Sequence, residues 1–218
     1  MNNIFDSIKL DYYILRTFSP GALLSSVGIA TLAGIISSSP GLIIGIVLMV
    51  SAFFMGGLFA VVEKNNINKL YGILPVRKQQ IVIGRYLLTL FVGVLNAAMA
   101  TILTYFVSFI LDIKLSYLTL IGWLFGSFFL FCLLVSMQFP IYFRYEFSKV
   151  SSISNMPAII LFIIGSALIK KRPELFQQTI NFFIDNQYMI WLIGIVGALL
   201  LLGVSMFLSY ALSKKRDF

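Results

Sequence analysis

The stretch 63-EKNNINKLYGILPVRKQQIVIGRY-86 is the one long polar interruption in an otherwise strongly apolar chain. On either side lie the apolar runs 42–62 and 81–111. Each run is long enough to cross a bilayer, which takes about 20 helical residues. A short, basic, amphipathic piece between two such runs predicts a connection between two membrane-spanning helices, and it raises the question of what that connection touches.

The composition of the whole chain supports a membrane location. Of its 218 residues, 60% are hydrophobic and 11% are charged, and the mean hydropathy is +0.98. A soluble domain of this size has too little interior to bury so much apolar surface. The net charge of +8 comes from short basic clusters between apolar runs, which typically set membrane orientation and meet anionic lipid headgroups. We therefore expect lipid, and no nucleic acid, as a partner.

The apolar pattern predicts an all-α, polytopic membrane protein with a single transmembrane domain over 1–218. Each of its apolar runs has roughly the length of a spanning helix, although the third is long enough to project beyond the hydrocarbon and the fifth is short. The six predicted spans are Pro20–Ser38, Leu42–Val62, Ile81–Leu111, Leu115–Met137, Ser154–Ile169 and Tyr188–Leu212.

The distribution of Lys and Arg predicts the orientation of these spans. With the N-terminus inside, twelve of the sixteen basic residues fall on the cytoplasmic side and four on the outer side. Cytoplasmic loops carry the excess of basic residues. We therefore expect a protein of the plasma membrane with both termini in the cytoplasm. The run Lys170, Lys171 and Arg172 opposes this rule and has no explanation in the scheme.

Two further segments are expected to lie along the membrane surface. In residues 1–19 an apolar stripe at helical spacing predicts an interfacial helix on the inner leaflet; its members are Ile4, Phe5, Ile8, Tyr12 and Leu15. In the extracellular segment 170–187, Pro173 and Glu174 favour the start of a half-buried outer helix before the last span. Arg85, near the inner end of the third span, is expected to snorkel to the headgroups.

The sequence contains few residues of the kinds that carry out catalysis or bind metals and nucleotides. It contains no histidine, a single cysteine (Cys132) and no G-x-x-x-x-G-K-[ST] phosphate-binding loop. Without paired carboxylates or a metal-ligand cluster, we expect no enzymatic activity and no cofactor or metal bound by this chain. Two GxxxG spacings, Gly41 to Gly45 and Gly122 to Gly126, predict close helix approach.

The polar segment itself predicts a short amphipathic helix. Ile67, Leu70, Tyr71 and Leu74 follow the i, i+3, i+4, i+7 spacing of one helix face, and Pro75 ends the helix. Two interpretations remain open from the residues alone. The helix either lies on the inner leaflet or docks as a rigid knob in a pocket of a cytoplasmic partner.

A resemblance favours the second interpretation. The segment resembles the signature loop of type-2 ABC exporter permeases, in particular the small six-span permeases of Gram-positive bacteria that export peptides or confer immunity to antimicrobial peptides. Arg77 stands where those permeases more often carry Ser or Thr. The six-span layout and the second inner loop, 139-FPIYFRYEFSK-149, are also similar. The residues that carry the resemblance are Glu63-Lys64, Leu74-Pro75-Val76-Arg77-Lys78, Ile81-Val82 and Arg85-Tyr86.

The resemblance implies that the cytoplasmic coupling loop 63–80 seats in a separate ABC ATPase. It assigns apolar contacts to Leu70, Tyr71 and Leu74, and a hinge to Pro75. The rim charges would be Glu63, Lys69 and Arg77. The second inner loop would contribute Arg144, Tyr145, Glu146 and Phe147.

The same resemblance implies partners and cargo. Two ATPase subunits would bind ATP and Mg, and the permease would pair with a second copy or a paralogue. The cargo would be amphipathic peptides, such as antimicrobial or toxin-like peptides. Two other functions stay open on the residues alone: an ATP-independent channel or secondary carrier, and a membrane scaffold or sensor whose 63–86 loop binds a signalling protein.

Overall fold

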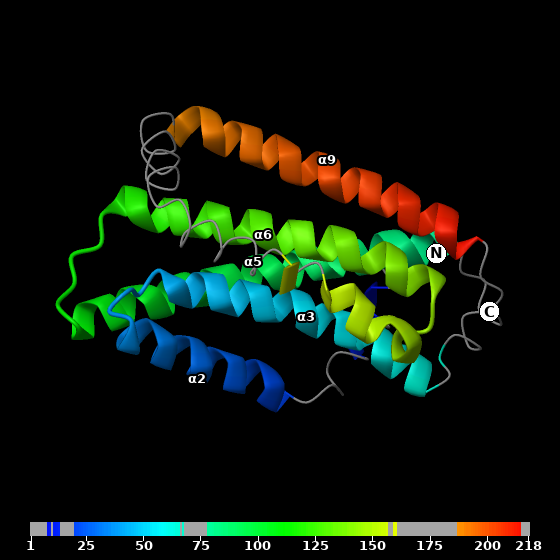
Figure 1. The fold of residues 1–218 in the computed structure, drawn as a ribbon, viewed down its shortest axis with the longest axis horizontal. Coiled ribbons are helices and arrows are strands. Elements are labelled where there is room, and N and C mark those ends of the chain that lie inside the picture. Colours follow the sequence, from blue (N-terminus) through cyan, green and yellow to red (C-terminus); the bar gives the residue numbers. More distant parts are fainter. Residues whose placement is uncertain are drawn as a thin grey trace.

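A computed structural model describes residues 8–9, 11–13, 20–65, 67, 78–156, 159–160 and 187–214. Within these ranges the chain is helical and contains no strand, which confirms the all-α prediction. A further helical stretch, 147–156, follows α6 after a break at residues 145–146. The long helices, shown in Figure 1, are α2 (Pro20–Ile36), α3 (Leu42–Lys64), α5 (Lys78–Ile110), α6 (Tyr117–Arg144) and α9 (Gln187–Ser213).

Four of the described helices are long and apolar enough to cross a membrane: α3, α5, α6 and Leu192–Ser213 of α9. They match the second, third, fourth and last predicted spans. Helix α2, at the place of the first predicted span, has 17 residues and is shorter. Most of the fifth predicted span, and segment 170–186 with its basic run, lie outside the described residues, so the count of six spans stays a prediction.

The helices pack side by side, with α3 between α2 on one side and α5 and α6 on the other (Figure 1). Helix α3 contacts α2, α5 and α6, while α6 also packs against α9. Of the four spanning helices, α3 is the most buried and α9 the least. The end where α3 and α6 end and α5 begins is called the inner end here, after its predicted cytoplasmic side.

Close helix approach explains one of the two GxxxG spacings. A Cβ added at Gly41 would lie 2.4 Å from the Trp123 ring, and one at Gly45 would lie 3.5 Å from Ser127 Oγ. The first pair therefore lets α3 approach α6 within the chain. Gly122 and Gly126 have no atom within 4 Å of such a Cβ, so the second pair faces open space in the described structure.

Helix α6 is longer than the sequence predicted. The fourth span was expected to end at Met137, but α6 continues to Arg144 with Pro140 inside it. Proline has no N–H, so it leaves the carbonyl four residues earlier without its helical partner. Here that carbonyl, on Ser136, accepts a hydrogen bond of 2.7 Å from Ser205 Oγ of α9. Packing against α9 thus stabilises the backbone where proline would otherwise end the helix.

Ser205 also links α9 to α5. The Tyr86 hydroxyl lies 2.6 Å from Ser205 Oγ and 2.9 Å from Ser209 Oγ. One helical turn further, Lys78 Nζ lies 3.4 Å from the carbonyl of Ser213, where a cation is favourable at a helix C-terminus. In lipid, interhelical hydrogen bonds of this kind add to van der Waals packing in holding helices together, so the inner halves of α5, α6 and α9 form one unit.

Candidate functional site

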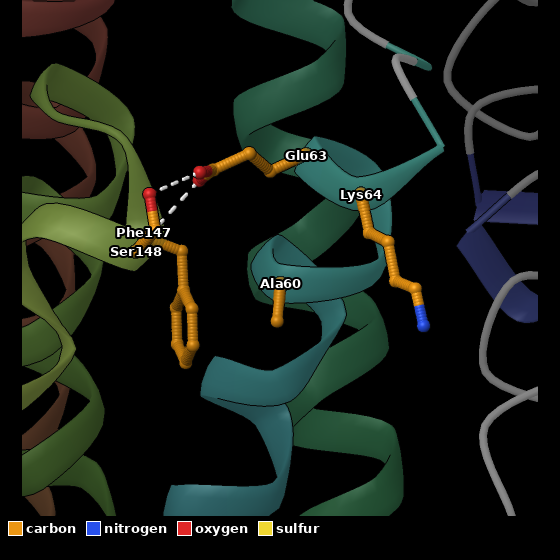
Figure 2. A pocket seen from close by; sticks show the side chains of 5 residues that line it. All are labelled: Ala60, Glu63, Lys64, Phe147 and Ser148. Carbon is orange, nitrogen blue, oxygen red and sulfur yellow. Dashed lines mark hydrogen bonds between the residues drawn. The ribbon is translucent and has the colours of Figure 1, made fainter.

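The inner end brings together two segments that are far apart in the sequence. Glu63, in the last turn of α3, accepts hydrogen bonds from the backbone N–H of Ser148 at 3.3 Å and from the Ser148 hydroxyl. Figure 2 shows the carboxylate reaching across from α3 to the loop. The contact joins the start of the predicted coupling loop 63–80 to the second inner loop.

The position of Ser148 explains why a carboxylate is stable there. Helix α6 ends at Arg144, and the next helical stretch, 147–156, starts directly before Ser148. The first N–H groups of a helix have no partner within that helix and carry a partial positive charge. Glu63 therefore acts as an N-terminal cap supplied by another helix.

A hollow of about 430 Å³ lies beside this contact. The Phe147 ring and Ala60 line it, while the exposed side chain of Lys64 extends from the opposite side of α3, away from Phe147 (Figure 2). The lining thus combines an apolar wall with a polar rim formed by the side chains of Glu63 and Ser148. Such a surface suits an apolar side chain flanked by polar groups.

The exposed charges of the second inner loop form a local pair. Lys149 Nζ lies 2.6 Å from Glu146 Oε2. The hydrogen bond and the charge of Glu146, with a smaller effect from Glu63, raise the pKa of Lys149 above its ordinary value of 10.5. Both side chains are exposed to solvent, at 75% and 47%, so this pair contributes little to stability, and that contribution is lost as the pH rises through the raised lysine pKa.

An aromatic cluster formed by α3, α6 and 147–156 packs next to the Glu63–Ser148 contact. The Phe59 ring centroid of α3 lies 5.2 Å from Phe139, 5.2 Å from Tyr142 and 5.1 Å from Phe143 of α6. Tyr142 in turn lies 5.1 Å from Phe147 at the start of the next helix. Edge-to-face and tilted ring pairs add about 0.5–1.5 kcal/mol each beyond simple burial. The cluster therefore couples the end of α3 firmly to α6 and to 147–156.

Five of the eleven predicted site residues lie in the described structure. It brings Glu63 and Phe147 together at the hollow. Arg144, Tyr145 and Glu146 are exposed at the same end, with the Arg144 guanidinium 5.0 Å from the Tyr145 ring centroid. The remaining six lie outside the described residues and stay predictions: Lys69, Leu70, Tyr71, Leu74, Pro75 and Arg77.

Sequence reasoning missed two features of the inner end. Ser148 was not among the predicted residues, although its place just after a helix start would suit a capped N–H. Arg85 was expected to snorkel to the headgroups, and this expectation is wrong, because its side chain is only 6% exposed and is paired with Asp11. An acid near the N-terminus and a base within a span were both visible, but nothing in the sequence paired them.

The Glu63 cap can be tested by substitution. Glu63→Ala should raise hydrogen exchange at residues 148–151 and lower stability by about 1 kcal/mol, because it removes a helix cap. The measurement is hydrogen exchange of the detergent-solubilised chain read by mass spectrometry. Lys64→Ala, at the exposed neighbour, is the matched control. Equal exchange in the two variants would contradict a capping role.

Comparison with known proteins adds the family. The profile of a family described as "ABC-2 family transporter protein" matches residues 8–214, which include both inner loops. No curated protein and no solved structure matches the chain. Together with the four apolar helices of spanning length, the profile match shows that the chain belongs to the ABC-2 transporter family and is a membrane permease subunit of an ABC transporter.

Proposed function

We propose that this permease exports amphipathic peptides, driven by a separate ABC ATPase that docks on the inner end. The observation that best supports the docking surface is the Glu63–Ser148 contact. It places the start of segment 63–80 beside the loop 144–147, so one partner subunit could touch both segments. The neighbouring hollow, with its Phe147 wall and charged rim, would take an apolar side chain of that partner.

A movement of the ATPase against the inner end would be transmitted to several helices of the permease at once. Segment 63–80 is continuous with α3 on one side and α5 on the other. The cluster around Phe59 links α3 to α6, and the Tyr86 contacts link α5 to α9. Because helices and packed cores are stiff, closure of two ATPase subunits on ATP and Mg would tilt each permease as a body.

The path for the cargo would lie between two permeases, either two copies or one copy and a paralogue. Helix α5 carries a long apolar face that the described chain leaves uncovered, including Phe91, Tyr105 and Phe106. Such a face suits either lipid or the apolar side of an amphipathic peptide. The resemblance to peptide-exporting permeases favours a peptide as the cargo.

Reconstitution in proteoliposomes tests this function. The chain would be inserted with and without the ABC ATPase that copurifies with it, and the probe would be a fluorescent, cationic amphipathic peptide. We expect uptake of the probe only when the ATPase, ATP and Mg are all present. Uptake with the chain alone, driven by a gradient, would identify a channel or secondary carrier. A bound cytoplasmic protein that shows no ATP turnover would identify a scaffold.

A further inference from the structure

Among the first described residues of the chain, the Asp11 side chain is turned towards the helix bundle. Among helical residues 11–13, Asp11 is fully buried, while Tyr12 and Tyr13 are 55% and 54% exposed. Ile8, three residues before Asp11, packs against an apolar cluster at the inner end formed by Leu58, Val62, Ile81 and Leu88. Ile8 and Asp11 are therefore both turned towards the protein.

Arg85 of α5 meets this carboxylate. Its Nε lies 3.4 Å from Asp11 Oδ2, and the two side chains are 6% and 0% exposed. The guanidinium carbon also lies 4.6 Å from the Phe59 ring centroid and 5.5 Å from that of Phe143. A cation within about 6 Å of an aromatic face is attracted by the ring. Among the described contacts, the Arg85 charge thus meets the Asp11 carboxylate and two aromatic rings, which come from three other segments.

Because the Asp11 and Arg85 side chains are both buried, the stability of each charge depends on the presence of the other. An ionised side chain that is removed from water without a partner is strongly unfavourable, and more so within a membrane protein. If Asp11 left the bundle, the buried Arg85 guanidinium would lose the Asp11 carboxylate, and Asp11 would become hydrated. The pair therefore favours one placement of the N-terminal segment over all others.

We propose that Asp11 and Arg85 are positioning residues that lock the N-terminal segment onto the inner end of the bundle. The segment is then a fixed part of the body formed by α3, α5 and α6, and it does not lie free on the inner leaflet. The apolar stripe read from the sequence is divided accordingly: Ile8 packs on the protein, whereas Tyr12 is left exposed. The lock itself stands apart from the proposed function, and only its use in transmitting motion rests on it.

Cross-linking of the full chain in membrane vesicles, without any ATPase, tests the lock. Cys132 is replaced by Ala, and cysteines are introduced as Ile8→Cys and Val62→Cys for a short bismaleimide. We expect Asp11→Asn to lower the cross-linked fraction at least five-fold and Asp11→Glu to restore most of it. Asp112→Asn, the same change at an exposed position, should leave the fraction unchanged.

A double-variant cycle supplies the second readout. Asp11→Asn and Arg85→Gln should each lower the melting temperature of the solubilised chain, while the double variant should melt above either single one, because it removes both buried charges together. Insertion of the double variant where a single one fails to insert would support the lock equally. Unchanged cross-linking in Asp11→Asn, additive losses in the cycle, or failure of both single and double variants to insert would overturn it. Because no partner is present, these results are independent of whether an ATPase docks.

Discussion

A variant with both Leu70→Arg and Tyr71→Ala is expected to lose copurification with the ABC ATPase completely, while still inserting into the membrane. Both residues belong to the predicted apolar face of segment 65–75, and both lie outside the described residues. If that face seats in a pocket of the ATPase, an arginine there would be a buried charge without a partner, and the lost tyrosine would remove an anchor. A buried aromatic anchor contributes about 2 kcal/mol or more to the binding free energy of an interface. The two changes together should therefore remove more binding free energy than a typical transient complex can lose without dissociating.

The measurement is affinity purification of a tagged chain, followed by detection of the ATPase and of ATP turnover. Leu70→Met with Tyr71→Phe is the matched control and should keep the complex. One described contact makes a second readout necessary: Ile67, at the start of the same predicted stripe, packs against the bundle. The melting temperature of the chain alone therefore has to be compared between the two variants. A retained complex with undiminished transport in the first variant would contradict the docking assignment.

The spanning helices were predictable because the bilayer imposes a length and a composition on each of them. The run 42–62 became α3 (Leu42–Lys64) almost unchanged, since a long apolar stretch bounded by polar residues has few other solutions in lipid. The end of α6 was not predictable in this way. Its continuation through Pro140 depends on a hydroxyl from Ser205, and such a partner is known only once α9 is in place.

The contacts of the inner end were the least predictable part. Charge counting placed Glu63 and the 139–149 loop on one side of the membrane, but it could not bring Glu63 to Ser148, 85 residues away. Arg85 was read from its own helix, where a long basic side chain near a membrane surface usually snorkels. Its partner, Asp11, lies 74 residues earlier, and only the packed fold makes burial of the pair more favourable than exposure.

Phe59→Ala is expected to be the most destabilising single truncation at the inner end. Phe59 is 6% exposed and contacts three rings of α6 as well as the Arg85 guanidinium. Phe-to-Ala changes in packed cores cost about 3–5 kcal/mol. Part of that cost is transfer from water, which is reduced where lipid surrounds the protein, so we expect a loss of about 2–3 kcal/mol. Unfolding of the chain in mixed micelles with increasing SDS measures it.

Phe109→Ala is the matched control, because the ring of Phe109 on α5 is 86% exposed and meets no residue of the aromatic cluster. Its loss should stay within about 0.5 kcal/mol, as for exposed positions in general. Phe59→Ala should also weaken ATP-driven uptake beyond its effect on stability, since this ring contacts three rings of α6 one turn before the Glu63 cap. Equal stability losses in the two variants would contradict the packing argument. A normal uptake rate in a destabilised but folded Phe59→Ala permease would show that motion reaches α6 by another route, through 147–156 and Ser148.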